Sequence, residues 1–128
     1  MTVLKLPWSW EAEIHVIGAA LLDPSLPTSD CRMDAADFED GINRTIWDAI
    51  SRLASNGGYS SSVDVWRLLE AEGAHAKCRE RLIDAEEAVP SSTFGAHHAT
   101  TVRRLAALRR FAKVCASTWE GACTESEP

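Results

Sequence analysis

Three groups of side chains in this sequence are of types that could carry chemistry: an acidic cluster, a pair of histidines and a run of basic residues. The acidic cluster comprises Asp84, Glu86 and Glu87. Neighbouring carboxylates act as a general acid and a general base when burial shifts one of their pKa values toward neutrality. Because Ala85 and Ala88 stand between and after these carboxylates, we expect the solvated end of a helix instead of an acid–base pair.

The adjacent histidines His97 and His98 could bind one metal ion only if their rings faced the same way. Successive residues of an α-helix diverge by about 100°, so the two rings cannot easily reach one ion. His98 falls on the apolar line of its expected helix, and we interpret it as a partly buried packing residue.

The remaining histidines and the cysteines offer no better metal site. The histidines supply no i, i+4 pair, and the cysteines contain no C-x-x-C and match no zinc spacing. We therefore expect no metal and no other cofactor, and we expect reduced thiols in a cytoplasmic protein. The cysteines are Cys31, Cys78, Cys115 and Cys123.

The run VRRLAALRRFAK at residues 102–113 carries more information. On a helix, four of its basic side chains share an arc of about 120°, and Arg104 lies on the other flank of the apolar line. This is either a solvated face whose long side chains cover apolar surface, or a docking site for an acidic protein surface or nucleic acid. A base-stacking platform needs several aromatic rings, and only Phe111 is present, so an acidic protein surface is favoured. The candidate partner-binding residues are Arg103, Arg104, Arg109, Arg110, Phe111, Lys113 and Trp119.

The charge distribution also limits the possible partners. The chain has 128 residues, 45% hydrophobic and 25% charged, which is ordinary for one globular domain. Its net charge of −6 argues against a nucleic-acid footprint over the whole surface. Residues 1–90 carry a net charge of −8 and residues 91–128 carry +2, so an anionic partner would meet the C-terminal third.

The common catalytic motifs do not occur. An ATP-driven motor needs G-x-x-x-x-G-K-[ST] to hold phosphates, and no glycine here is followed by Lys-Ser or Lys-Thr. Neither G-x-S-x-G nor H-E-x-x-H is present. On these residues alone, the sequence predicts a binding module and not an enzyme.

The first element that must support these groups is a helix from about Ser9 to Asp23. Its segment WSWEAEIHVIGAALL contains charges, lacks the basic flank of a signal peptide and is too short in its apolar part to span a membrane. It has one apolar stripe, with Glu13 and Ala19 pointing elsewhere, and therefore predicts the first helix of a soluble domain. The stripe consists of Trp10, Ile14, Ile17 and Leu21, with Gly18 and Leu22 beside it.

Further helical segments follow. A stripe over residues 42–53 ends at a glycine pair, a capped helix runs from Ser61 or Ser62 to Gly73, and a less regular segment covers residues 78–88. The stripe over 42–53 consists of Ile42, Ile46, Ile50 and Leu53.

The longest helical candidate runs from about Thr93 to Trp119. Its expected apolar line is His98, Thr101, Leu105, Leu108, Ala112, Cys115 and Trp119. We therefore predict an all-α domain over residues 1–119, a compact bundle of five to six helices ending in one long C-terminal helix. We expect residues 120–128 to form an acidic, disordered tail.

The order of these motifs resembles the N-terminal domain of DnaB-type bacterial replicative DNA helicases. That family opens with Pro-x-x-x-Glu-Ala-Glu-x-x-Val-Leu-Gly-x-x-Leu-Leu-x-Asp-Pro, and PWSWEAEIHVIGAALLDP at residues 7–24 is similar to it. Later family segments resemble Phe38, IWDAISRL at 46–53, the helix from Ser61 to Gly73, VPSS at 89–92 and the final helix with Arg109-Arg110. The resemblance covers about residues 7–115.

The resemblance implies the function of the family's N-domain. That domain is a non-catalytic collar, separate from the ATPase motor, which pairs helicase subunits and offers a docking surface to primase and loader proteins. The family's last helix is the first arm of a helical hairpin through which neighbouring N-domains pair, and only this arm is matched here. The resemblance also implies that Gly18 makes a close packing contact in the bundle and that Glu11 and Glu13 lie on the surface.

Two origins are compatible with this resemblance. The chain is either an excised N-domain of a full helicase or a small complete protein, for instance from a phage or plasmid, that serves the helicase–primase system as adaptor, loader or inhibitor. The expected partners are a second copy in a dimer or higher oligomer, a replicative helicase, and a primase or helicase loader, with no membrane. The alternative is a DNA-binding replication regulator that uses the basic face at residues 103–113, which predicts strongly salt-dependent binding.

Overall fold

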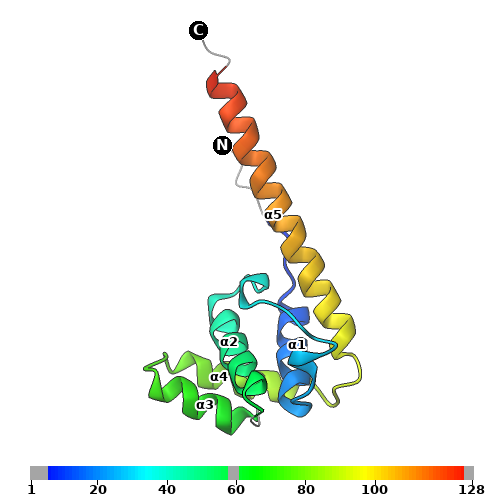
Figure 1. Cartoon of the computed structure of the whole chain (residues 1–128), viewed down its shortest axis with the longest axis vertical. Coiled ribbons are helices and arrows are strands. Elements are labelled where there is room, and N and C mark those ends of the chain that lie inside the picture. Colours follow the sequence, from blue (N-terminus) through cyan, green and yellow to red (C-terminus); the bar gives the residue numbers. More distant parts are fainter. Residues whose placement is uncertain (1–5, 58–60, 126–128) are drawn as a thin grey trace.

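The computed structural model describes residues 6–57 and 61–125, with the backbone alone for 120–125. Every regular element of this part is helical, so the predicted all-α fold with a long last helix is confirmed. None of the described helices combines the length and apolar content needed to cross a membrane. The helices are α1 (Trp10–Leu22), α2 (Gly41–Ser55), α3 (Ser62–Ala71), α4 (Lys77–Ala88) and α5 (Gly95–Glu125), with short 3-10 helices η1 (Leu26–Thr28) and η2 (Ala35–Asp37). Figure 1 shows α1 to α4 gathered into a body from which α5 projects.

The starts of α1, α2 and α3 follow from polar side chains that cap them. Ser9, Asp40 and Ser61 each accept a hydrogen bond from a backbone N–H in the first turn of α1, α2 and α3. Gly73, two residues after the end of α3, has a φ of +75°, a left-handed conformation that glycine adopts without strain. The sequence predicted a cap at Ser9, a cap at Ser61 or Ser62, and the break at Gly73.

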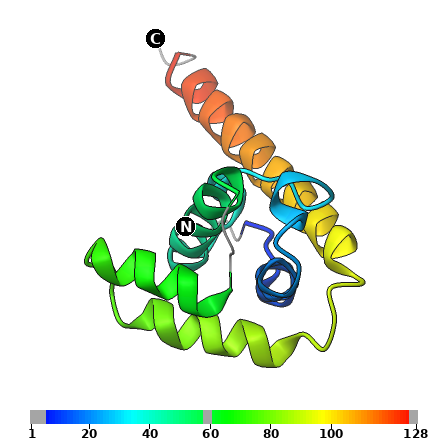
Figure 2. The same cartoon turned by 60° about the horizontal axis from the view of Figure 1, so that its bottom comes forward.

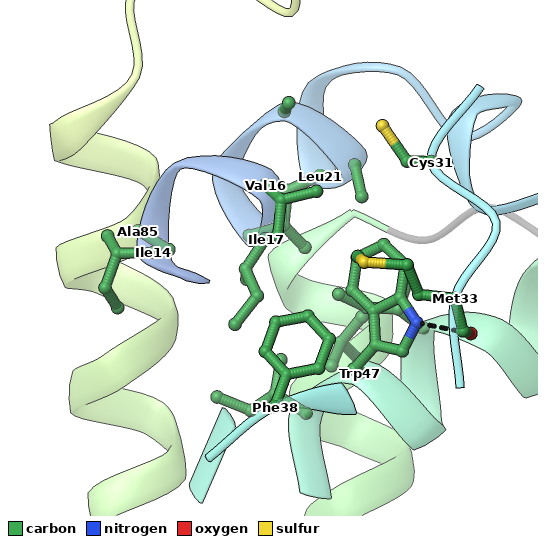
Figure 3. Packing of buried hydrophobic residues seen from close by; sticks show 14 of the residues in the cluster. Ile14, Val16, Ile17, Leu21, Cys31, Met33, Phe38, Trp47 and Ala85 are labelled. Atoms are coloured by element: carbon green, nitrogen blue, oxygen red, sulfur yellow. Dashed lines mark hydrogen bonds between the residues drawn. The ribbon is translucent and has the colours of Figure 1, made fainter. Parts of the chain in front are cut away.

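The core is centred on two aromatic rings (Figure 3). Phe38 and Trp47 are fully buried, with ring centroids 5.2 Å apart, and the Trp47 indole N–H donates to the Met33 carbonyl at 3.1 Å. Leu53 is partly buried and packs against this core. The structure also buries the predicted core residues Ile14, Ile17, Leu21, Ile46 and Ile50.

Helix α1 is the central helix of the body. It packs against α2, α4 and α5, and Figure 2 shows it nearly end-on among them. The prediction of a single buried stripe was therefore wrong, since Glu13 and Ala19 are each 1% exposed. Trp10, predicted to be a core residue, is 44% exposed and instead carries the guanidinium of Arg81 at 4.2 Å from its ring centroid.

Gly18 lies in the contact between α1 and α4. A Cβ at this position would collide with the carbonyl oxygen of Ala85 and lie 2.5 Å from Cγ2 of Val89. The expected close packing contact at Gly18 is therefore present.

Helix α5 has two different halves. Its first half packs against α1 and η2 through a line of small side chains, Ala99, Val102 and Ala106. This line lies to one side of the expected apolar line, of which Leu108 and Trp119 are 48% and 71% exposed.

The helical backbone of α5 continues to Glu125, beyond the expected end at Trp119. The prediction of a disordered tail from residue 120 was therefore wrong up to Glu125. Residues 126–128 of that tail lie outside the described residues.

Candidate functional site

Arg109 attaches α5 to the body. Its side chain donates to the carbonyls of Asp37 and Pro7 at 2.8 and 3.0 Å and forms an ion pair with Glu39 at 3.0 Å. Arg109 is only 4% exposed, so all of its polar capacity is directed to the chain's own backbone and side chains. The prediction that Arg109 belongs to an exposed docking face was therefore wrong, because the body itself supplies its acceptors.

The other predicted basic residues divide into two groups. Arg110 pairs with the Asp37 carboxylate at 3.0 Å, and Arg103 donates to the Arg32 carbonyl at 3.0 Å. Arg104 and Lys113 are exposed and make no hydrogen bond or ion pair with a described residue. Two of the five predicted basic side chains are thus unpaired among the described residues.

A buried polar network holds the body together where α1, α2 and η2 meet. The Glu13 carboxylate accepts from the Asn43 side-chain amide at 2.9 Å and from the Glu39 backbone N–H at 2.8 Å. The predicted surface position of Glu13 was wrong, because these donors hydrogen-bond its carboxylate inside the body. The isolated sequence gives no signal for this pairing, which joins residues on different helices.

Asp40 and Arg81 extend this network to α4. The Arg81 guanidinium lies 2.7 Å from the carboxylate of Asp40 and 2.7 Å from the side-chain oxygen of Asn43. Burial alone would raise the pKa of Asp40, but the Asn43 backbone N–H and the Arg81 guanidinium outweigh it and hold that pKa below its usual value. The loop before α2 therefore has a fixed position, and Arg109 binds that same loop.

Beyond Arg109, no described side chain of α5 is buried. Leu108, Phe111 and Trp119 are 48%, 69% and 71% exposed, and Cys115 is exposed with them. These four residues follow an i, i+3, i+7, i+11 spacing, which places them within an arc of roughly 80° on one side of the helix. We call these four residues the distal face.

The distal face has the pattern of a helix that packs against another helix. Apolar residues three and four positions apart form the contact stripe of helix pairs and bundles. Contiguous exposed apolar surface on a protein marks interaction sites, because burying one large apolar side chain contributes about 1.5–3 kcal/mol. Phe111 and Trp119 were predicted partner-binding residues and lie in this face. Leu108, Cys115 and Trp119 also belonged to the apolar line that was expected to pack within the chain.

The histidines form a stack and not a chelate. His98 is half-buried, as expected, and its ring stacks on that of His15 with centroids 4.8 Å apart. Burial, with the neighbouring His15 and His97, lowers the pKa of His98, although Glu11 acts in the opposite direction. Across residues 6–57 and 61–119, no group of three or more potential ligands could hold a metal ion.

Two of the described thiols are shielded and one is accessible. Cys31 and Cys78 are buried, whereas Cys115 is exposed on the distal face. Burial raises the pKa of the Cys31 thiol to about 11, which keeps it protonated and unreactive. Cys115 is therefore the described thiol that a reagent in solution can reach.

Comparison with known proteins relates this chain to one domain family and to solved structures. A family model described as the DnaB-like helicase N terminal domain matches residues 5–104. Among solved structures, the N-terminal domain of DnaB helicase from Mycobacterium tuberculosis superimposes with a TM-score of 0.88 at 24% identity, over 96% of this chain and 88% of that one. That likeness shows a shared fold. No curated protein sequence matches.

Proposed function

Because the chain belongs to the family of DnaB-like helicase N-terminal domains, we propose that it is a non-catalytic interaction domain of the DNA replication machinery that associates through the distal face of α5. The family is that of a replicative helicase, and the matched domain is the part of the helicase outside its catalytic motor. The first proposed partner is a second copy of this chain, in a dimer or higher oligomer. The others are a replicative helicase, a primase or a helicase loader.

The observation that carries this proposal is the exposure of Leu108, Phe111 and Trp119 on one side of α5. A stripe of this kind is self-complementary, so two copies can each cover the other's apolar side chains. Phe111 and Trp119 supply aromatic anchors, which dominate binding energy at protein interfaces. The first half of α5 is fixed to the body by Arg109, so the distal face is presented at a defined angle.

DNA binding through the basic residues is the second candidate. It has less support, because Arg103, Arg109 and Arg110 are engaged with the chain's own carbonyls and carboxylates. Two unengaged cations would release few counterions, so we do not expect the strongly salt-dependent duplex binding that this candidate predicts. Strong salt-dependent binding that is lost in an Arg104→Glu, Lys113→Glu double variant would favour this candidate over self-association.

Cysteine cross-linking tests the proposed pairing directly. In a Cys123→Ser background, mild oxidation with diamide should join two Cys115 thiols into a disulfide, with their two hydrogens transferred to diamide. Cys31 and Cys78 are buried and should not react. We expect a covalent dimer on a non-reducing gel.

Two exposed variants on the same helix provide the matched comparison. Phe111→Glu places a charge in the distal face and should abolish the cross-link, whereas Ser117→Glu places the same charge on the opposite side of α5 and should preserve it. Absence of a Cys115 dimer, or equal cross-linking in Phe111→Glu, would contradict pairing through this face.

A further inference from the structure

Helices α3 and α4 form an open groove away from α5. Figures 1 and 2 show these two helices side by side at the end of the body that α5 does not cover. The groove has a volume of about 410 Å³ and lies between one side of α3 and one side of α4. We call it the α3–α4 groove.

Apolar side chains form the floor and the mouth of the groove. Trp66 and Leu82 lie at its floor, with Leu82 only 2% exposed and Trp66 packed against the core. Val63 and Ile83 stand at the mouth and are 57% and 46% exposed. Two large aliphatic side chains on neighbouring helices are therefore left in water next to an apolar floor, the arrangement of a surface that a partner covers.

Two unpaired arginines border the same groove. Arg67 and Arg79 line it, and neither donates to a carboxylate or carbonyl among residues 6–57 and 61–119. This contrasts with the polar groove near Glu72, where Arg52 holds Glu72 at 2.7 Å and Asp48 at 3.0 Å. In a segment with a net charge of −8, the α3–α4 groove thus presents two arginines and one carboxylate, Glu70, and no described ion pair joins them.

The helical spacing of the lining residues suits a third helix. Along α3, Ser62 lies at the start of the helix, and the other lining residues are Val63, Trp66, Arg67 and Glu70, an i, i+3, i+4, i+7 series on one side of the helix. A groove between two such helices receives an amphipathic helix that inserts its own apolar residues at the same spacing. A cavity of roughly 150 Å³ accepts benzene, so the volume here suffices for about two to three large apolar side chains.

We propose that the α3–α4 groove docks an amphipathic helix of another protein, with apolar residues directed between Trp66 and Ile83 and carboxylates facing Arg67 and Arg79. Glu70 is the one carboxylate in the lining and disfavours a uniformly acidic peptide, so the carboxylates of the partner belong on the flanks near the two arginines. The distal face is on a different element, so this docking does not depend on pairing through α5. The chain would then join a partner at each of two separate surfaces.

The test uses the whole chain and two synthetic helical peptides that share one leucine stripe. One carries glutamate on both flanks and the other carries lysine at the same positions. Titration of isotope-labelled protein, followed by amide and indole NMR shifts, reports both affinity and location. We expect saturable shifts in α3, α4 and the Trp66 indole, with the glutamate peptide binding at least about tenfold tighter, the equivalent of about 1.4 kcal/mol.

Matched variants distinguish binding of the peptides in this groove from non-specific binding elsewhere on the protein. An Arg67→Glu, Arg79→Glu double variant should reverse the preference between the two peptides, and Ile83→Glu should weaken both. Lys77→Glu changes the charge of an exposed α4 residue outside the groove and should leave the preference unchanged. Circular dichroism establishes that each variant is folded.

Three outcomes would overturn the proposal: equal affinity for the two peptides, shifts that map to the distal face instead of α3 and α4, or no saturation at millimolar peptide. Each of these leaves the Cys115 cross-link unaffected, so the groove and the distal face can fail independently. Binding of the peptide with an unchanged preference in the double arginine variant would also contradict the assigned role of Arg67 and Arg79.

Discussion

The guanidinium of Arg109 donates a hydrogen bond to the main-chain carbonyl of Asp37 at 2.8 Å, across 72 residues of sequence. The Asp37 carboxylate in turn pairs with Arg110 at 3.0 Å, one residue further along α5. Two successive arginines therefore hold the segment around η2 at the point where α5 leaves the body. This connection sets the direction in which the distal face is presented.

Replacing Arg109 should loosen the attachment of α5. An Arg109→Met variant leaves the carbonyls of Asp37 and Pro7 and the Glu39 carboxylate without their donor, so we expect the free energy of unfolding to fall by about 2–4 kcal/mol. Arg110→Met removes an ion pair whose arginine side chain is 62% exposed, and should cost under about 1 kcal/mol. Urea denaturation of both variants measures the difference, and equal losses would contradict a special role for Arg109.

Gly18 should tolerate no side chain. Gly18→Ala places a methyl group against the Ala85 carbonyl and Val89, which forces α1 and α4 apart and should reduce the free energy of unfolding by about 1–3 kcal/mol. Gly41→Ala is the matched control, since a Cβ there meets nothing within 4 Å, and it should be neutral or stabilise by up to about 1 kcal/mol. Thermal denaturation separates the two, and a neutral Gly18→Ala would show that the helices do not touch there.

His98 should make the fold less stable in mild acid. Its pKa is lowered in the folded state by burial and by His15 and His97, so the unfolded chain takes up the proton first as the pH falls below the usual value of 6.5. Stability is therefore fully present above that value and decreases as the pH falls from there toward the lowered pKa. His98→Gln should flatten the dependence of unfolding free energy between about pH 7 and about pH 5.

The control for this prediction is His75→Gln, which changes an exposed histidine outside the stack. That variant should retain the wild-type dependence on pH. A wild-type chain whose stability is constant over the same range, or an equal effect of the two variants, would exclude the His15–His98 stack as the cause.

Sequence patterns predicted the helices well because caps, glycine breaks and apolar spacing are local properties. Ser9, Ser61 and Gly73 mark helix ends in the structure as they do in the sequence. The spacing of Ile46 and Ile50 likewise identified the buried side of α2. Gly18 was the informative exception, since its role in the contact with α4 followed from the family resemblance and not from spacing.

The positions that the sequence misplaced are those decided by partners far along the chain. Glu13 looked like a surface residue, but Asn43 and the backbone after η2 supply donors that make its burial favourable. Arg109 shares its helix and its charge with exposed arginines, and only the location of Asp37 and Pro7 distinguishes it. Periodicity reports which residues share a side of a helix, and it does not report which side faces the body.

The same limit applies to the candidate site. Spacing placed Leu108, Cys115 and Trp119 on one apolar line, but that line was expected to pack within the chain, whereas the structure leaves these residues exposed beside Phe111. Helix α5 carries two apolar stripes, and the one made of Ala99, Val102 and Ala106 packs on the body because small side chains permit close approach. The distal face, which has the larger side chains, is therefore left exposed to solvent.

Sedimentation equilibrium of the whole chain tests whether the distal face of α5 pairs copies of this chain. We predict a dimer or higher oligomer whose dissociation constant rises at least about a hundredfold in Phe111→Glu, equivalent to about 2.8 kcal/mol, and stays within about threefold in Ser117→Glu. A wild-type chain that remains monomeric at high concentration, or a Phe111→Glu variant that associates as strongly as the wild type, would contradict pairing through the distal face.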